Sequence, residues 1–368
     1  MNIALDAHYI GTNCGGVETY VYNLIESILK IDNNNKYCLY LSPFLKKEIL
    51  PFINDNVSVE YLLSDKSAFR TFIDIPFKLS KRRPDIYHGQ IFLPPFAYSV
   101  KKILTLQDVF FLNNMSWLTI KERIKFKHIY YSVAKADHII TISDFSKKEI
   151  LKNFNLPEKK ISVIYCGVSD DFFKKRGLSA SQNIKDKYSL PENYLLYVGR
   201  INVRKNILIL LKSFAMLKQR LKNPVKLVIA GKPDGKNKNI HKIIGELNLQ
   251  EDVLFLGYIP YEDLPYIYSL SRLFVFIPFY EGFGLPPLEA MASGIPVIAS
   301  NIPVFRETLG DAALLVDPDN PVQISSAMND LLNNKNLSLS LIEKGTKRAM
   351  LFNWRDSASK TIEIYNTL

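Results

Sequence analysis

Short apolar runs alternate with longer amphipathic segments along most of the 368-residue chain. The runs are rich in Val, Ile, Leu and Tyr and carry few polar residues, which is typical of parallel strands buried on both faces. Between them lie segments with helical periodicity, such as 17–30 (VETYVYNLIESILK) and 207–222 (ILILLKSFAMLKQRLK). This alternation predicts an α/β architecture built on parallel sheets.

The rhythm breaks once, at the polar segment 177–191 (GLSASQNIKDKYSLP), which separates two groups of predicted strands. The first group is 2–7, 37–42, 57–63, 85–89, 102–108, 138–143 and 161–167, and the second is 193–199, 225–231, 253–258, 272–278, 295–300 and 313–318. A chain of this length exceeds one ordinary core. We therefore expect two doubly wound domains, 1–180 and 190–350, whose ligands bind beyond the carboxyl ends of the strands. The last segment, 352–368, is predicted to be one amphipathic helix that could return to the first domain.

Composition and charge narrow the class of protein. Hydrophobic residues make up 47% of the chain, as in globular proteins, and the net charge is +11, with the larger excess before Gly177. Such a charge favours an anionic partner: phosphates, nucleic acid or an acidic membrane face. No nucleic-acid-binding motif is present, so nucleic acid is not expected. Three cysteines, no leader-like first segment and no run long enough to span a bilayer predict a cytoplasmic protein, soluble or peripheral to the membrane.

Two glutamates bracket a hinge-like segment, EGFGLPPLEAMASG, after the predicted strand 272–278. Glu281 follows the strand end, and Glu289 lies early in a helix that Pro286 and Pro287 can start. The backbone N–H groups of residues 283–285 would offer donors at a helix N-terminus, where anions bind. Together these groups suit sugar and ribose hydroxyls and phosphates. The alternative is that Glu289 only favours a helix start and Glu281 is a solvated loop residue.

Basic residues follow the first strand of the second group, in YVGRINVRKN. The strand ends in Gly199, and Arg200 and Lys205 come next, before a helix. Two cations in this position predict a clamp for a diphosphate. The alternative is a solvated basic loop, and for Arg204 we favour that interpretation.

Two further loops in the first half follow predicted strands. GTNCGGVETY places Gly15 and Gly16 where backbone can approach a ligand, although it is not the dinucleotide fingerprint and would read as a tight turn if it stood alone. LTLQDVFF and HIITISDFSKKEI place Asp108 and Ser143 at strand ends, each a weak signal by itself.

Taken together, these motifs resemble the family four retaining glycosyltransferases with the GT-B fold: two facing Rossmann-like domains with a cleft between them. The resemblance covers nearly the whole chain and is most specific in VGRINVRKN, in ITISDFSKKEI followed by VIYCGV, and in EGFGLPPLEAMASGIPVIASNIPVFRE. HGQIFLPP together with the ISDFSKKEI region resembles the mannosyltransferase-like branch of bacterial surface-polysaccharide assembly.

The resemblance implies a role for each matched residue. Arg200 and Lys205 would hold the donor diphosphate, Glu289 the ribose hydroxyls and Glu281 the transferred sugar. Backbone contacts to the donor would come from the glycines and their neighbours, which are Gly15, Gly16, Gly199, Gly282, Phe283, Gly284 and Leu285. The resemblance also implies that the two basic residues replace a metal, so that no cofactor is required. We accordingly treat the metal-like motif of Asp317 and Asp319 as a false positive.

One position departs from the family pattern. Many relatives carry His-Asp where this chain has Gln107 and Asp108. An amide hydrogen-bonds but carries neither proton nor charge at neutral pH. Either the chemistry tolerates Gln107, or His88 shares the contact to sugar or acceptor. In this family the leaving phosphate is thought to take the acceptor proton, so charge stabilisation would matter more than a protein base.

These observations predict a retaining, metal-independent transferase that moves a sugar from a nucleotide-sugar donor to a growing, lipid-linked glycan. GDP-mannose is the expected donor, with UDP- and dTDP-sugars as alternatives. The main alternative function is a catalytically silent nucleotide-sugar-binding subunit of a glycan-assembly complex, which Gln107 keeps open. An epimerase on the same plan is conceivable, whereas a dinucleotide-dependent oxidoreductase lacks its fingerprint.

A basic and aromatic segment, 117–135 (WLTIKERIKFKHIYYSVAK), is predicted to be helical. Its ordinary interpretation is a surface helix with one face on the core. The alternative is a face that docks on an anionic membrane surface, with 81–83 (KRR) and Lys101–Lys102 as further basic groups.

Overall fold

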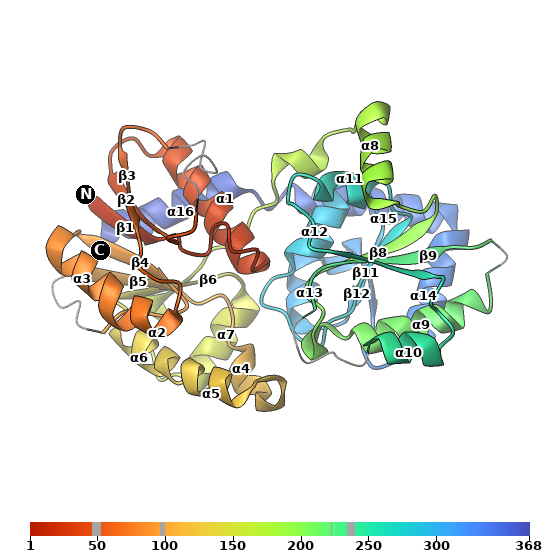
Figure 1. Ribbon diagram of the computed structural model, residues 1–368, viewed down its shortest axis with the longest axis horizontal. Coiled ribbons are helices and arrows are strands. Elements are labelled where there is room, and N and C mark those ends of the chain that lie inside the picture. Colours follow the sequence, from red (N-terminus) through yellow and green to blue (C-terminus); the bar gives the residue numbers. More distant parts are fainter. Residues whose placement is uncertain (46–52, 96–99, 222, 234–239) are drawn as a thin grey trace. The chain divides into compact units, whose positions relative to one another are not determined.

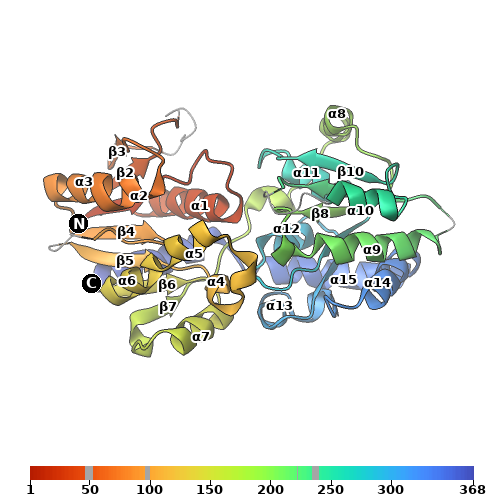
Figure 2. The same cartoon turned by 60° about the horizontal axis from the view of Figure 1, so that its bottom comes forward.

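The computed structural model describes residues 1–45, 53–95, 100–221, 223–233 and 240–368, which divide into two compact units. The first comprises Met1–Gly167 together with Asn353–Leu368, and the second comprises Val168–Phe352. In each unit the described strands form one parallel sheet, with helices along its two faces (Figure 1, Figure 2). The predicted fold class is confirmed, because each predicted apolar run overlaps a strand of one of these sheets.

The sheet of the first unit has the strand order β3-β2-β1-β4-β5-β6-β7. Its strands are β1 (Asn2–Asp6), β2 (Lys36–Leu41), β3 (Val57–Tyr61), β4 (Ile86–Gln90), β5 (Lys101–Thr105), β6 (His138–Thr141) and β7 (Ile161–Val163). The helices are α1 (Gly16–Ile31), α2 (Ser67–Phe69), α3 (Ile75–Arg82), α4 (Phe110–Asn113), α5 (Ile120–Phe126), α6 (His128–Lys135), α7 (Asp144–Asn153) and α16 (Trp354–Thr367). The predicted single helix over 117–135 is two helices, α5 and α6, with a break at Lys127.

The sheet of the second unit has the order β10-β9-β8-β11-β12-β13. Its strands are β8 (Tyr194–Val198), β9 (Lys226–Ala230), β10 (Val253–Gly257), β11 (Leu273–Phe276), β12 (Val297–Ser300) and β13 (Leu314–Val316). The helices are α8 (Leu178–Tyr188), α9 (Ile207–Lys218), α10 (Ile240–Glu246), α11 (Leu264–Ser269), α12 (Leu285–Ala292), α13 (Pro303–Thr308), α14 (Pro321–Asn333) and α15 (Lys335–Ala349). The polar segment 177–191 contains α8 and belongs to this unit.

The last helix, α16, lies beside α1 in the first unit (Figure 1). Its buried face includes Trp354, Ala358 and Tyr365. The Ser357 hydroxyl donates to the carbonyl of Tyr165 at 2.6 Å. A Cβ atom at Gly167 would stand 2.2 Å from the backbone nitrogen of Trp354, so only glycine allows this close approach.

The strand orders define where ligands of such sheets bind. In the first unit the order turns back between β1 and β4, and in the second between β8 and β11. Loops that leave neighbouring strands at such a switch point diverge and open a crevice at the carboxyl edge. The segments after β8 and β11 carry Arg200, Lys205 and Glu281, and the segment after β1 carries the glycine loop.

Candidate functional site

The segment after β8 places Lys205 at the switch point of the second unit. Asn202 caps the short turn Val203–Lys205, since its side chain accepts a hydrogen bond from the Lys205 backbone N–H at 3.1 Å. The Lys205 ammonium lies 4.9 Å from the centre of the Phe276 ring, at the end of β11. Its side chain is 12% exposed. The backbone of Lys205 is thus fixed by its own loop after β8, while its ammonium reaches the end of β11.

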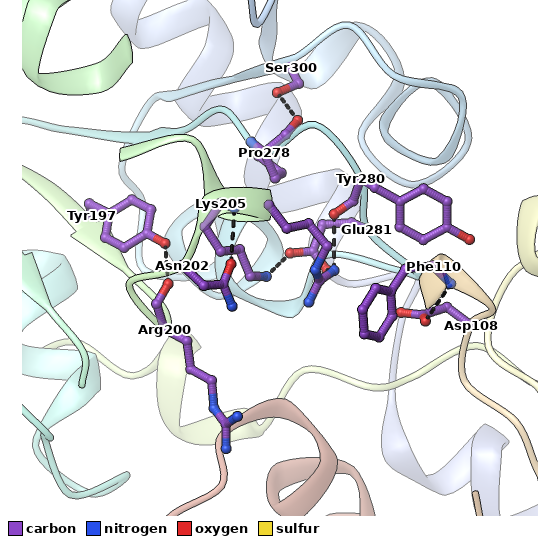
Figure 3. Close-up of polar contacts among 11 residues, drawn as sticks. Asp108, Phe110, Tyr197, Arg200, Asn202, Lys205, Pro278, Tyr280, Glu281 and Ser300 are labelled. Carbon is purple, nitrogen blue, oxygen red and sulfur yellow. Dashed lines mark hydrogen bonds and ion pairs between the residues drawn. The ribbon is translucent and has the colours of Figure 1, made fainter. Parts of the chain in front are cut away.

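The segment after β11 brings Glu281 to the same place. The Ser300 hydroxyl at the end of β12 donates to the carbonyl of Pro278 at 2.7 Å, which fixes the chain where it leaves the sheet. Glu281 is 9% exposed and forms an ion pair with Lys205 (Figure 3). This pair joins two residues 76 positions apart in sequence.

Arg204 is a third member of this cluster. Its Nη1 donates to the carbonyl of Tyr280 at 3.0 Å and lies 3.4 Å from Oε2 of Glu281. The sequence favoured a solvated loop for Arg204, and this interpretation is wrong: its side chain is only 17% exposed and engages the loop that follows β11. A contact across two strands cannot be recognised from a basic loop sequence alone.

Arg200 takes a different direction. The residue is exposed, and its carbonyl accepts a hydrogen bond from the Tyr197 hydroxyl at 2.9 Å. Its side chain points away from Lys205 and Glu281 (Figure 3). The two cations of the predicted clamp therefore do not converge in this structure. Arg200 stands on the same segment as Lys205, but its guanidinium would have to rotate to share an anion with it.

The helix α12 begins immediately after Gly284, with prolines in its first turn. Gly284 has φ +99°, and a Cβ atom there would lie 2.4 Å from the Phe305 ring, so glycine is required. The carbonyl of Phe283 accepts a hydrogen bond from the Thr308 hydroxyl at 3.1 Å. Leu285 is the first residue of the helix. These contacts fix the direction in which the first turn of α12 presents its backbone N–H groups.

Glu289 lies on α12, is 5% exposed, and accepts a hydrogen bond from the Tyr268 hydroxyl at 3.1 Å. Burial raises the pKa of Glu289 to about 7, and the Tyr268 hydrogen bond opposes that rise. The carboxyl is thus divided between its neutral and charged forms near neutral pH. A ligand that donates hydroxyl groups to it would favour the charged form.

In the first unit, the glycine loop is held by a carboxylate. Gly15 caps α1, and Gly16 is its first residue. The Glu18 side chain accepts hydrogen bonds from the backbone N–H groups of Gly11 at 2.7 Å and Cys14 at 2.9 Å. Sequence analysis did not single out Glu18; its position in the first turn of a helix after two glycines is the available signal.

Gln107 and Asp108 follow β5 in the first unit. The Asp108 carboxylate accepts from the backbone N–H of Phe110 at 3.2 Å (Figure 3). The amide nitrogen of Gln107 is buried and has no hydrogen-bond partner among the described residues. An amide donor in this condition is one that a ligand oxygen would satisfy.

His88 is committed to the packing of α16. Its Nδ1 lies 2.7 Å from the Tyr365 hydroxyl, and its Nε2 lies 2.7 Å from the Thr105 hydroxyl. Burial lowers the pKa of His88 to about 4, so the ring is neutral at pH 7. The structure gives no support to the predicted sugar or acceptor contact of His88, because both ring nitrogens have intramolecular partners.

A second histidine lies at the switch point of the first unit and was missed in the sequence. His8 follows β1, and its Nδ1 lies 2.5 Å from the Asp6 carboxylate. Burial acts to raise the pKa of Asp6, but His8 and the nearby Arg70 outweigh it and hold that pKa below its usual value. The spacing Asp-x-His at the end of a buried strand is the signal that could have revealed this pair.

The described residues contain no group of three or more His, Cys, Asp and Glu side chains that could hold a metal ion. Asp317 and Asp319 form a local turn, in which the Asp319 backbone N–H donates to the Asp317 carboxylate at 3.0 Å. Among the described helices, none has both the length and the apolar character that crossing a bilayer requires.

Comparison with known proteins gives the family. Residues 14–172 match the model described as Glycosyltransferase Family 4, and residues 180–348 match that described as Glycosyl transferases group 1. The chain is 32% identical over 286 residues to O-antigen chain mannosyltransferase B of Escherichia coli, covering 77% of this chain and 74% of that protein. It is 36% identical over 201 residues to O-antigen chain mannosyltransferase RfbU of Salmonella typhimurium, covering 54% of this chain and 52% of that protein.

Solved structures agree on the fold. The Anabaena protein HepE, crystallised with UDP-glucose, superposes with a TM-score of 0.78 at 16% identity and covers the whole of both chains. Identity this low supports the fold alone. With the sequence relatives and the two parallel sheets, the finding is clear: the chain belongs to the family four glycosyltransferases with the GT-B fold, in their mannosyltransferase-like branch.

Proposed function

We propose that this glycosyltransferase moves mannose from GDP-mannose, with retention of configuration and without a metal ion, to a growing lipid-linked glycan of O-antigen type. The observation that carries the proposal is the cluster of Lys205, Arg204 and Glu281 at the switch point between β8 and β11. This cluster places cationic side chains, which could bind a diphosphate, next to a carboxylate, which could accept hydrogen bonds from sugar hydroxyls. The names of the O-antigen mannosyltransferase relatives support the choice of sugar and product.

The roles follow from the chemistry of each group. Lys205 would bind the donor diphosphate and stabilise the negative charge that grows on it as the bond to the sugar breaks. Arg200 would join it by rotating its exposed side chain. Glu281 would exchange its ion pair for hydroxyls of the transferred sugar, and Glu289 would accept hydrogen bonds from the ribose. The N–H groups at the start of α12 would add donors to the same ligand.

Metal independence is part of this proposal. Transferases that use a metal place it on the diphosphate, where it neutralises the leaving group. Here the cations of Lys205 and Arg200 would supply that charge. The acceptor proton would pass to the leaving phosphate oxygen, which requires no protein base and is compatible with an amide at Gln107.

We further propose that the first unit docks on an anionic membrane surface, where a lipid-linked acceptor resides. Exposed apolar side chains on the segment from α2 to α3 and on α5 are mixed with basic ones. The apolar members are Phe69, Phe72, Ile73, Phe77, Ile120 and Ile124, and the basic members are Lys81, Lys121, Arg123, Lys125 and Lys127. The segment from α2 to α3 lies close to the start of α6, which follows α5, because the Phe72 and His128 ring centres lie 4.8 Å apart. Apolar groups surrounded by lysine and arginine suit the interface of an acidic bilayer.

The donor assignment is tested by thermal unfolding of the purified protein with GDP, UDP, dTDP and ADP. A ligand that binds only the folded state raises the melting temperature, by an amount that grows with the logarithm of its concentration relative to its dissociation constant. We expect a shift with GDP that is lost in Lys205→Ala and reduced in Arg200→Ala. A shift with UDP or dTDP alone would reject GDP-mannose as donor. No shift with any nucleotide would reject the nucleotide-sugar site itself.

A further inference from the structure

Tyr268 lies on α11 with its side chain fully buried, and its hydroxyl reaches a neighbouring helix. The hydroxyl donates to Oε2 of Glu289 on α12 at 3.1 Å. The ring is fixed by two phenylalanines: its centre lies 5.3 Å from that of Phe274 and 5.8 Å from that of Phe172. A ring packed in this way has one direction in which its hydroxyl can point.

The hydrogen bond uses one of the two oxygens of Glu289. Oε1 has no hydrogen-bond partner among the described residues, and it is not fully buried. It is therefore the oxygen that a ligand can reach. A glutamate has three side-chain torsions, so an unanchored carboxylate would sample several orientations. Anchoring Oε2 to a rigid phenol leaves Oε1 in one place. Burial makes a lone carboxylate costly, so a single side-chain donor is a large part of what holds it there.

We propose that Tyr268 is a positioning residue that holds Glu289 in the orientation in which its carboxylate accepts hydrogen bonds from the ribose hydroxyls of the nucleotide donor. This inference rests on the proposed function, which assigns Glu289 to the ribose. It adds that recognition of a ribonucleotide depends on a phenol that does not touch the ligand.

A second buried tyrosine, Tyr194 on β8, also forms a hydrogen bond with α11, but with a backbone carbonyl. The Tyr194 hydroxyl donates to the carbonyl of Ile267, the residue before Tyr268, at 2.7 Å. Both tyrosines are fully buried. Tyr268 belongs to α11, whereas Tyr194 only donates a hydrogen bond to that helix. Only Tyr268 bonds to an ionisable side chain. Tyr194→Phe is therefore a matched control, since it removes one hydroxyl and one hydrogen bond of the same helix without touching Glu289.

The experiment measures the dissociation constants of GDP and 2′,3′-dideoxy-GDP by isothermal titration calorimetry. The proteins are the wild type, Tyr268→Phe and Tyr194→Phe. The ratio of the two constants isolates the ribose hydroxyls, because the base and diphosphate are common to both ligands. Hydrogen bonds to a charged group are worth enough that we expect the wild type to prefer GDP by about tenfold or more. In Tyr268→Phe the ratio should fall to about threefold or less, and in Tyr194→Phe it should stay within about twofold of the wild type.

A double-mutant cycle separates positioning from a general loss of structure. With Glu289→Ala as the background, adding Tyr268→Phe should leave the ratio unchanged, because the carboxylate that Tyr268 orients is absent. A further fall in that background would overturn the inference. So would a Tyr268→Phe ratio equal to that of the wild type, or equal falls in both tyrosine variants.

The outcomes also separate this inference from the proposed function. If the wild type binds neither GDP nor its dideoxy analogue, the GDP assignment fails. If it binds both with the same affinity, the donor site stands but Glu289 does not read the ribose, and the role of Tyr268 is overturned. A preference for GDP that is lost only in Tyr268→Phe supports both.

Discussion

Replacing Glu289 with Gln should stabilise the second unit at alkaline pH while weakening nucleotide binding. Burial raises the pKa of Glu289 to about 7 in the folded protein, against an ordinary value of 4.5. A carboxyl with a raised folded pKa stabilises the fold below its unfolded pKa, and this contribution is lost as pH rises through the folded pKa. The difference corresponds to about 3 kcal/mol of unfolding free energy at high pH.

Glutamine is nearly isosteric, carries no charge and keeps an oxygen that can accept from Tyr268. We therefore expect the stability of Glu289→Gln relative to the wild type to rise by about 2 to 3 kcal/mol between about pH 5 and about pH 9. For a unit of this size that is about 5 to 10 °C in melting temperature.

The assay must report on the second unit. Both tryptophans, Trp117 and Trp354, belong to the first unit, so their fluorescence follows the wrong transition. Differential scanning calorimetry across the pH range, with hydrogen exchange of the β8 amides to assign the transition, resolves it. Tyr194→Phe serves as a control that should show no pH-dependent difference. A Glu289→Gln difference that is the same at both pH values would refute the claim that this carboxyl is buried with a raised pKa.

The remaining predictions concern the diphosphate clamp, the glycine loop and the membrane face. Lys205→Ala should lower transfer by about 10² to 10³ with the fold intact, because it removes the charge that stabilises the leaving group; steady-state rates near those of the wild type would reject the clamp. Glu18→Ala should lower the stability of the first unit by about 1 kcal/mol, because the N–H groups of Gly11 and Cys14 lose their acceptor; tryptophan-monitored denaturation measures this, and an unchanged midpoint would contradict it. Ile124→Asp should weaken co-sedimentation with phosphatidylglycerol vesicles, whereas the control Leu339→Asp at an exposed position of the second unit should not; equal effects would reject the docking face.

The fold could be predicted because parallel strands covered on both faces leave a clear signal. The run RLFVFIP contains β11, for example. The polar segment 177–191, which was predicted to separate the domains, lies within the second unit, which begins at Val168. The turn at Lys127 that divides α5 from α6 could not be predicted, since lysine is a good helix former and its own propensity marks no interruption there. Local propensity and periodicity fix the elements, but packing decides where one stops.

Side-chain contacts within the site were much harder to predict than the loops that carry them. The sequence indicated that Lys205 and Glu281 follow strand ends and that Glu289 lies early in a helix, but not that Lys205 and Glu281 form a pair. Such contacts join residues far apart in the chain, and their geometry depends on the register of strands between them. His88 shows the converse: a histidine near motif residues invited a functional role, whereas packing against Tyr365 occupies its ring.

Transfer of radiolabelled mannose tests the central claim most directly. The protein is incubated with GDP-[³H]mannose and a glycolipid extract of bacterial membranes that carries lipid-linked glycans, with Lys205→Ala as the matched blank. The account predicts label in the lipid-extractable glycan, released by an α-mannosidase, and about 10² to 10³ times less with the variant. If the wild type binds GDP-mannose but leaves all label in the nucleotide sugar or in free mannose, the chain binds a donor without transferring it, and the proposed activity is contradicted.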